Sequence, residues 1–312
     1  MNLNGKNMKL YKNFNVSRNH KRSIILIGNF DGVHQGHQKL FKLANNYKKK
    51  FKLNVGVLTF EPMPKMFFNK NFKNFRISNI NQKNRILESL GVDFLITKKF
   101  DKKFSQIKAD FFIKEILSKK LEAKYIFVSN NFRFGNKRTG DVRKLVKNEK
   151  TYDYKIIKPQ ALILNKKIIS STYIRSLLEK GDLKKANKLL GRNWLIEGIV
   201  QKGRQEGKKI GFPTCNIDIQ DYVIAMPGVY VAMVHQKNSK KPLKAIVNLG
   251  YRPTFNQKKI LLEAHIFNFS GNLYNKYLSV EFIKFIRKEK KFKNVSQLRR
   301  QIQSDLKIAK KN

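Results

Sequence analysis

Residues 24–40 read IILIGNFDGVHQGHQKL and decide the fold of the first part of the chain. Ile24–Ile27 has the length of a buried strand, and apolar residues return from Leu40 onward at helical spacing. Gly28–His37 between them is a tight glycine-rich loop, so the order is strand, loop, helix. The free N–H groups and the positive dipole end of such a helix attract phosphate. His34 and His37 stand at this helix mouth as hydrogen-bond donors, which favours chemistry on a nucleotide triphosphate.

The composition indicates a folded protein with a large positive charge. The 312 residues suffice for two domains, and 41% hydrophobic and 12% aromatic residues are typical of globular proteins. The 67 Lys and Arg against 21 Asp and Glu give a net charge of +46. A basic face could bind nucleic acid, but the lysines are spread through nearly every segment, as in the proteins of an AT-rich genome. Nucleic-acid binding is therefore the lesser hypothesis.

The single cysteine and the apolar runs bear on the location of the protein. Cys215 has no partner for an internal disulfide. No apolar run approaches the roughly 18–20 residues that a membrane span needs. These features predict a cytoplasmic protein without a membrane partner, and they leave its oligomeric state open.

Residues 1–185 alternate between strand and helix patterns, which predicts a parallel sheet flanked by helices. Ligands bind such sheets at the carboxyl ends of the strands, where the Gly28–His37 loop falls. The expected strands are Ile24–Ile27, Val55–Phe60, Phe94–Thr97, Tyr125–Val128 and Tyr154–Ile157, and the expected helices are Gln38–Lys48, Asn81–Leu90, Ala109–Lys119 and Gly140–Asn148.

The pattern of the sequence changes after the first half of the chain. After two short helical patterns, Ser171–Glu179 and Leu183–Leu190, short strand-like runs begin at Trp194 and are separated by turn residues. This pattern predicts an antiparallel barrel or sandwich, followed by a helix over Val295–Ile308. The change of period alone puts the domain boundary near residue 185.

The histidine pair has other interpretations. Isolated histidines are usually structural, Asp31 could be a simple turn residue, and an HxxH pair could hold a metal, although no third ligand is evident nearby. The whole run favours a functional role over these alternatives, because it resembles the GxFDGVHxGH motif of the prokaryotic FAD synthetases, which are HxGH nucleotidyltransferases. Thr59–Pro64, Val128–Gly135 and Ile169–Arg175 resemble further motifs of that family in the same order.

The resemblance implies adenylyl transfer: the phosphate of FMN attacks the α-phosphorus of ATP, pyrophosphate leaves, and Mg²⁺ bridges the phosphates. No protein nucleophile or base is needed, so His34 and His37 act as donors that stabilise charge. Ser129 stands where the family has glycine. The residues implied for ATP are Gly28, Phe30, Asp31, His34, Gly36, His37, Ser171, Thr172 and Arg175, although Ser171 and Thr172 could simply cap a helix. Those implied for flavin are Pro62, Pro64 and Asn131.

Residues 203–216 form a second glycine-rich constellation. The residues alone favour a hairpin, and no Walker A motif is present. Thr214 and Asn216 offer oxygen ligands on one side of an extended segment, and hard oxygen donors suit Mg²⁺. The segment resembles the GxxxGRxLGFPTAN motif of riboflavin kinases, with Lys208 in place of arginine and Cys215 in place of alanine. Pro227–Tyr230, Asn248–Phe255 and Glu263–His265 continue the resemblance.

This second resemblance implies a riboflavin kinase. Glu263 becomes the general base that takes the proton of the ribityl hydroxyl; without the resemblance it would be an ordinary strand glutamate. Thr214 and Asn216 are the implied Mg²⁺ ligands, Cys215 is a packed residue, and Arg287 matches a family position without an assigned role. The residues implied for ATP are Gly203, Gly207, Lys208, Gly211, Pro213 and Thr214.

Together the resemblances cover roughly residues 20–310. They imply a Rossmann-like nucleotidyltransferase domain (1–185) followed by a small antiparallel β-barrel kinase domain with a C-terminal helix (186–312). Riboflavin would be phosphorylated to FMN and FMN adenylylated to FAD, with ATP as the donor in both steps. The alternatives are that one activity has been lost, with Ser129 and Lys208 the positions to suspect, or that the chain is a basic nucleic-acid-binding protein on an inherited fold.

Overall fold

The computed structural model describes residues 7–69, 71–203, 205–237, 239, 241–253 and 258–311. It divides into two compact units. The first comprises Met1–Lys73 and Ile80–Ile169, and the second comprises Asn74–Asn79 and Ser170–Asn312. Residues 170–185 group here with the second unit, and the domain boundary at residue 185 stays a prediction.

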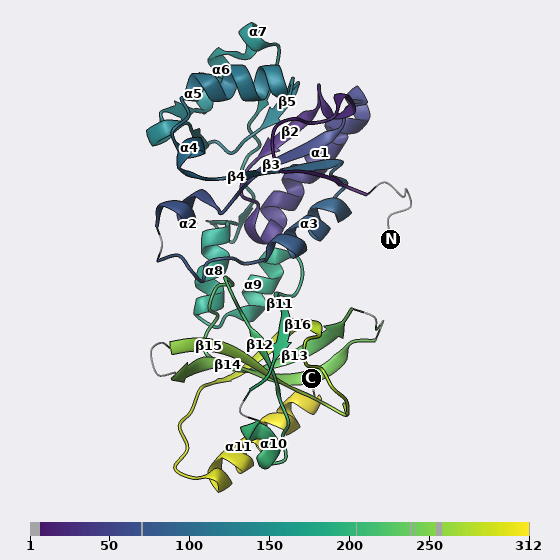
Figure 1. Ribbon diagram of the computed structural model, residues 1–312, viewed down its shortest axis with the longest axis vertical. Helices are drawn as coiled ribbons and strands as arrows, with labels where there is room; N and C mark the ends of the chain where they lie inside the picture. The colour runs from purple at the N-terminus through teal and green to yellow at the C-terminus, as the bar shows by residue number, and fades with distance from the viewer. Residues whose placement is uncertain are drawn as a thin grey trace. The chain divides into compact units, whose positions relative to one another are not determined.

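The first unit is built on a sheet of six parallel strands in the order β1-β4-β3-β2-β5-β8 (Figure 1). The central strands are apolar along their whole length because both faces of the sheet are covered. The predicted parallel sheet is therefore confirmed. The strands are β1 (Lys9–Tyr11), β2 (Ile24–Ile27), β3 (Val55–Glu61), β4 (Phe94–Lys99), β5 (Tyr125–Phe127) and β8 (Lys155–Ile157).

Alternate residues of each strand point to opposite faces of the sheet and pack in two separate hydrophobic cores. In β2, Ile25 and Ile27 pack on one face, whereas Ile24 and Leu26 pack on the other. Helices α1 (Gln35–Phe51) and α3 (Ile80–Ser89) cover the Ile24 face. The Ile25 face is covered by α5 (Ala109–Phe111), its π-helical continuation η3 (Phe112–Lys120) and α6 (Val142–Lys147). Shorter elements of this unit are α2 (Pro64–Phe68), α4 (Lys102–Ser105), α7 (Glu149–Tyr152) and the two-residue strands β6 (Arg133–Phe134), β7 (Gly140–Asp141), β9 (Ile163–Leu164) and β10 (Lys167–Ile168).

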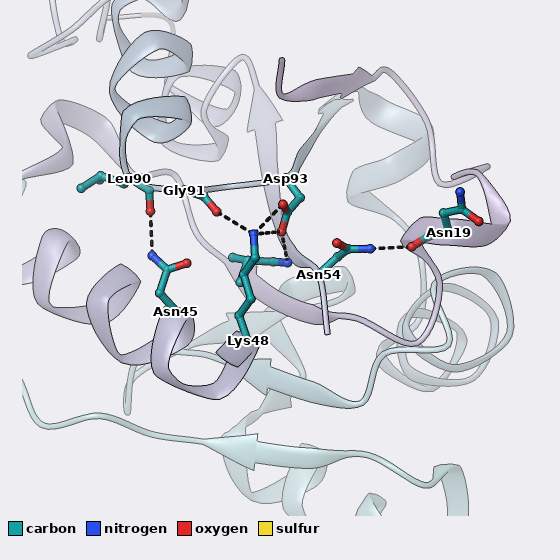
Figure 2. Close-up of polar contacts among 8 residues, drawn as sticks. Asn19, Asn45, Lys48, Asn54, Leu90, Gly91 and Asp93 are labelled. Atoms are coloured by element: carbon teal, nitrogen blue, oxygen red, sulfur yellow. Dashed lines mark hydrogen bonds and ion pairs between the residues drawn. The ribbon is translucent and has the colours of Figure 1, made fainter. Parts of the chain in front are cut away.

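Polar contacts fix the later turns of α1 beside the start of β4 (Figure 2). Asn45 Nδ2 donates to the Leu90 carbonyl (2.7 Å), and Lys48 Nζ lies 2.5 and 2.6 Å from the two carboxylate oxygens of Asp93. Asp93 Oδ2 also accepts the backbone N–H of Val55, at the start of β3, at 2.7 Å. These bonds hold α1 against the sheet at the end remote from His34 and His37.

The second unit contains a closed barrel with strand order β11-β12-β15-β14-β13-β16, in which every neighbouring pair is antiparallel. The predicted antiparallel barrel is confirmed. Helix α11 (Val295–Lys311) packs on its outside, where Ala309 joins Val229, Val231 and Ile246 in one apolar cluster (Figure 1). The strands are β11 (Leu195–Gln201), β12 (Cys215–Asp218), β13 (Gly228–Gln236), β14 (Leu243–Pro253), β15 (Lys258–Ile266) and β16 (Tyr277–Lys288).

The segment Asn74–Asn79 belongs to the second unit and is bound to it by hydrogen bonds of its backbone. The Val223 N–H donates to the Arg76 carbonyl (2.7 Å), and the indole N–H of the buried Trp194 donates to the Ile77 carbonyl (2.9 Å). The unit also contains α8 (Ser171–Glu179), α9 (Leu183–Leu190) and the short α10 (Glu206–Lys209). Helix α9 packs on β16.

An ion pair joins the last strand of the barrel to the last helix. Arg287 on β16 donates to both carboxylate oxygens of Asp305 on α11 at 2.7–3.0 Å, and Gln301 Nε2 donates to the same carboxylate at 2.9 Å. Asp305 is only 2% exposed. Removing one partner of such a pair leaves the other charge buried without compensation.

We predict that Arg287→Met destabilises the second unit, because it leaves the Asp305 carboxylate buried without its positively charged partner. The expected loss is about 3–5 kcal/mol in the free energy of unfolding. Trp194, the one tryptophan of the chain, lies buried in this unit, so its fluorescence in a urea titration reports the second unit. Arg299→Met, at an exposed position of α11, is the matched control; equal midpoints for the two variants would contradict the prediction.

Candidate active sites

Three loops of the first unit open at one edge of the sheet. Strand β2 pairs in parallel with both β3 and β5, so the carboxyl ends of these three neighbours lie at the same edge. The Gly28–His37 loop follows β2, Pro62 and Pro64 follow β3, and Asn131 follows β5. The fold thus brings the predicted nucleotide loop and the predicted flavin loops to one edge, which is the usual ligand position in such sheets.

The conformation of the Gly28–His37 loop depends on two close approaches. Phe30 adopts a left-handed conformation (φ 49°), and its ring contacts the His37 ring edge-to-face at 5.2 Å between centroids. A Cβ atom on Gly28 would lie 3.1 Å from the Phe30 ring, so glycine leaves space for this packing. Asp31 begins the 3₁₀ turn η2 (Asp31–Val33) and is buried.

His34 is the N-cap of α1. Its Nδ1 accepts the backbone N–H of His37 at 3.4 Å, which leaves the proton of the neutral ring on Nε2. The two imidazole rings stack, with centroids 3.7 Å apart and planes inclined by 18°. A Cβ atom on Gly36 would lie 3.1 Å from the His34 ring, so the glycine of the motif makes room for this arrangement.

The environment keeps His37 neutral. Its side chain is half-buried, and its enclosed Nδ1 atom has no hydrogen-bond partner among the described residues. Loss of hydration, reinforced by the neighbouring His34, lowers the pKa of His37 well below its usual range. A neutral imidazole can donate one hydrogen bond to a ligand. In the part of the chain that the structure describes, no three His, Cys, Asp or Glu side chains form a group able to hold a metal.

The remaining predicted residues of this reaction divide between the two units. Asn131 accepts a hydrogen bond from Ser129 Oγ (2.9 Å), so the serine that replaces the family's glycine orients the predicted flavin residue. The carbonyl oxygen of Ile169 lies 3.5 Å from the Cβ position of Gly36. The Ile169–Arg175 motif therefore begins next to the histidine loop, within the first unit.

Ser171, Thr172 and Arg175 lie on α8, in the second unit. Ser170 caps this helix by accepting the N–H of Tyr173 at 3.2 Å, so the expectation that Ser171 or Thr172 could serve as the cap is wrong. Arg175 is buried, its Nε donates to the Phe75 carbonyl at 2.7 Å, and its guanidinium lies 3.6 Å above the Phe75 ring. The arginine predicted to bind phosphate is thus oriented by the Asn74–Asn79 segment.

A row of side chains crosses the outer face of the barrel. Directly paired residues of antiparallel strands point to the same side of the sheet. Asn216 on β12 pairs with Glu263 on β15, which in turn pairs with Asn248 on β14. Val229 and Arg287 continue the row on β13 and β16. The structure thus brings the predicted base and one predicted metal ligand together. It adds Asn248, which lies in the Asn248–Phe255 motif and for which no role was predicted.

Asn216 carries a buried oxygen available to a cation. The residue is 6% exposed, and its Oδ1 has no hydrogen-bond partner among the described residues. A Cβ atom on Gly203 would lie 1.7 Å from its Nδ2, so glycine is needed there for the amide to lie where it does. Thr214 is exposed two residues earlier. Two hard oxygen donors, one of them unsatisfied, fit Mg²⁺.

The rest of the Gly203–Asn216 segment is held by local contacts. His265 Nδ1 lies 2.8 Å from the Pro213 carbonyl, and a Cβ atom on Gly207 would lie 2.4 Å from the Phe212 carbonyl. Lys208 is exposed on α10, and Gly211 adopts a positive φ of 87°. Burial raises the pKa of the Cys215 thiol to about 11, which keeps it protonated. Arg204, Thr254 and Phe255 of the quoted motifs lie outside the described residues.

A second carboxylate lies close to Glu263. A Cβ atom on Gly250, two residues beyond Asn248, would lie 1.9 Å from Glu289 Oε1, so the glycine leaves space for this side chain. Burial raises the pKa of Glu289, the negative charge of Glu263 adds to this rise, and Arg287 opposes it. No role was predicted for Glu289, which lies two residues after Arg287 in the sequence.

The depressed pKa of His37 predicts a pH-dependent stability of the first unit. The unfolded chain protonates this residue near its ordinary pKa of about 6.5, whereas the folded chain keeps it neutral to lower pH. The unfolded state then binds more protons below about pH 6.5, so the free energy of unfolding falls as the pH drops through that range. Hydrogen exchange of the β2 amides at pH 7.5 and 5.5 measures the loss.

His37→Asn removes the titrating group and should reduce this loss between the two pH values. Each unit by which the pKa is depressed corresponds to about 1.4 kcal/mol. The stability of the second unit, followed through Trp194 fluorescence, serves as the control and should respond to pH equally in both proteins. An unchanged pH dependence of β2 exchange in His37→Asn would contradict the prediction.

The two halves of the chain match two family models in order. Residues 16–173 match the model described as FAD synthetase, and residues 190–312 match the model described as Riboflavin kinase. Among the described residues, no helix has the length and apolar character that crossing a bilayer requires.

Whole-chain relatives extend these matches. One from Buchnera aphidicola subsp. Schizaphis graminum (strain Sg) is 39% identical, covering 97% of this chain and 98% of its own. One from Escherichia coli (strain K12) is 36% identical over 90% of each chain. Both are named bifunctional riboflavin kinase/FMN adenylyltransferase. A crystal structure described as a macrolide-efflux protein from Streptococcus pneumoniae is 29% identical, with a TM-score of 0.85 over 97% of this chain and 99% of that one. The chain belongs to the family of bifunctional riboflavin kinase/FMN adenylyltransferases.

Proposed function

We propose that the second unit transfers the γ-phosphoryl group of ATP to riboflavin, and that the first then joins AMP from ATP to the resulting FMN, releasing pyrophosphate. The observation that carries the proposal is the pairing of two separate reactive arrangements in one chain. One is the stacked His34–His37 pair at the mouth of α1, and the other is the Asn216–Glu263–Asn248 row on the barrel.

For adenylyl transfer, the FMN phosphate is already a nucleophile at neutral pH, so the protein has to position two anions and stabilise charge. The imidazole of His34 and the neutral imidazole of His37 donate hydrogen bonds to phosphoryl oxygens, and the first N–H groups of α1 add to them. Gly28, Phe30, Asp31 and Gly36 give the loop its shape. Removal of one such donor typically costs about 10²–10³ in turnover.

Ser171, Thr172 and Arg175 are further proposed ATP ligands, as the resemblance to the family motif implies. The resemblance of Ile169–Arg175 to the family motif supports this role, and within the first unit the motif begins at Ile169, beside Gly36. Arg175 supplies a charge-assisted bond to phosphate. Pro62, Pro64 and Asn131, at the ends of the neighbouring strands, bind the flavin of FMN.

For the kinase reaction, the 5′-hydroxyl oxygen of riboflavin attacks the γ-phosphorus of ATP. The bond from that phosphorus to the bridging oxygen breaks, ADP leaves, and Glu263 takes the hydroxyl proton. Thr214 and Asn216 hold Mg²⁺, which neutralises charge on the ATP phosphates when it is bound. Gly203, Gly207, Lys208, Gly211 and Pro213 surround the nucleotide, with Lys208 as a point charge where the family has the arginine fork.

The proposal also concerns the setting in which the enzyme works. ATP supply and an unpaired, protonated Cys215 both suit the cytoplasm. Riboflavin, FMN and ATP are the expected partners, and nucleic acid is not among them. Both family models match, which supports retention of both activities in one chain.

We predict that the two activities can be separated by single substitutions. His37→Asn should lower FAD formation from FMN by about 10²–10³ and spare FMN formation from riboflavin. Glu263→Gln should do the reverse, with FAD formation measured on supplied FMN. The measurement is chromatographic separation of flavins after incubation with ATP and Mg²⁺. Equal loss of both activities in either variant would contradict separate sites, and FMN as the sole product of the unaltered enzyme would contradict the adenylyl transfer.

We predict that Asn216→Ala weakens Mg²⁺ binding in the kinase site. The Mg²⁺ concentration for half-maximal FMN formation should rise about ten-fold or more, because a buried oxygen ligand is lost. The Mg²⁺ dependence of FAD formation from supplied FMN should not move. Asn46→Ala, at an exposed position of α1, is the control for the same chemical change. An unaltered Mg²⁺ dependence of FMN formation would remove Asn216 from the proposed ligands.

A further inference from the structure

Lys83 on α3 is the one buried lysine in the described part of the chain, at 3% exposed. Lysine is almost never fully buried without a specific role, because its ammonium loses hydration. In a chain with 67 lysines and arginines, the other described basic side chains that are buried are Arg76 and Arg175. Arg76 lies beside Asp221 and Arg175 beside Phe75, and Lys83 lies beside the loop of the first reactive site.

The Lys83 ammonium lies at the carboxyl ends of two neighbouring strands. Lys83 Nζ lies 3.3 Å from Thr59 Oγ1 on β3 and 3.5 Å from the carbonyl oxygen of Asn29, which follows β2. Thr59 Oγ1 itself lies 3.4 Å from the same carbonyl oxygen, and Thr59 is completely buried. Lys83 and Thr59 thus converge on one peptide group of the nucleotide loop.

That peptide group directly precedes the residue whose ring contacts His37. Asn29 precedes Phe30, whose left-handed conformation turns its ring against His37. Helix α3 also packs against η2, the next turn of the loop. A shift of the Asn29 carbonyl would therefore rotate Phe30 and release the ring that supports His37.

We propose that Lys83 is a positioning residue for adenylyl transfer. From α3, its ammonium holds the Asn29 carbonyl and through it the orientation of Phe30, His34 and His37, without itself touching the reacting atoms. This inference rests on the proposed role of the histidine pair. It adds a residue that belongs to none of the motifs compared above and comes from a different helix.

The test compares Lys83→Met, which keeps the length of the side chain and loses the ammonium, with Lys49→Met, the same change at an exposed position of α1. Lys83→Met should lower kcat of FAD formation by about 10–100-fold, the usual cost of misplaced catalytic groups, with little change in KM for FMN. FMN formation from riboflavin by the same protein should be unchanged, and Lys49→Met should match the unaltered enzyme in both reactions.

Thr59→Val keeps the ammonium and the side-chain volume and loses one hydroxyl bond, so kcat of FAD formation should fall by about five-fold. If kcat is normal in both Lys83→Met and Thr59→Val while His37→Asn has lost FAD formation, the proposed role of Lys83 is overturned and the role of the histidine pair is not. Full FAD formation by His37→Asn overturns the proposed site itself. If Lys83→Met does not fold, the Thr59→Val result decides: unaltered kcat rejects the proposal, and the expected fall supports it.

Discussion

The parallel pairing of β2 with β3 and β5 is the constraint on which the first unit depends. Ile24 lies opposite both Val55 and Tyr125, so the three strands start level and end at one edge. Helix α1 leaves this edge, and the Lys48–Asp93 ion pair fixes its far turns to the start of β4. Asp93 also accepts the N–H of Val55, which couples the helix to β3. These bonds hold the far end of α1, the helix that begins beside His34 and His37, against the sheet.

In the second unit, the antiparallel register of the closed barrel fixes the positions of the candidate site residues. Closure leaves no free edge, so a shift of one strand would have to move its neighbours on both sides. Asn216, Glu263 and Asn248 consequently keep the spacing of directly paired residues, about 5 Å between Cβ atoms. Strand β16, at the end of the row, is tied to α11 by the Arg287–Asp305 pair.

The sequence predicted the elements whose pattern is local and missed those created by tertiary contacts. The buried strands and the amphipathic helices have strong periodic patterns. Strand β12 has four residues, including Asn216 and Asp218, and becomes a strand through its pairing with β15. The short β1 has mostly exposed side chains, so no apolar run marks it. No local pattern marks Asn74–Asn79, whose place is set by backbone bonds to the barrel unit.

The candidate sites show the same division between local and tertiary information. The motif residues around His34 and Glu263 were available from the sequence, because their spacing carries a strong resemblance. The choice of Ser170 as the cap of α8 was not, since Ser170, Ser171 and Thr172 are three adjacent hydroxyl residues and only the backbone selects among them. Lys83 could not be distinguished among so many lysines, because burial is a property of the folded chain.

The net charge of the chain and the charged or polar groups within each site have different effects on the substrates. A net charge of +46, spread along the chain, creates a positive field that favours the approach of anions such as ATP and FMN. The same field would oppose a further full charge at the point of reaction, and His34 already lowers the pKa of its neighbour. Neutral imidazoles and backbone N–H groups stabilise phosphoryl charge without that repulsion. The barrel has the opposite requirement, because proton removal and cation binding need oxygen donors. In the proposed function Glu263 and Asn216 supply these donors locally, so that the positive field attracts the substrates and the side chains of each site determine its chemistry.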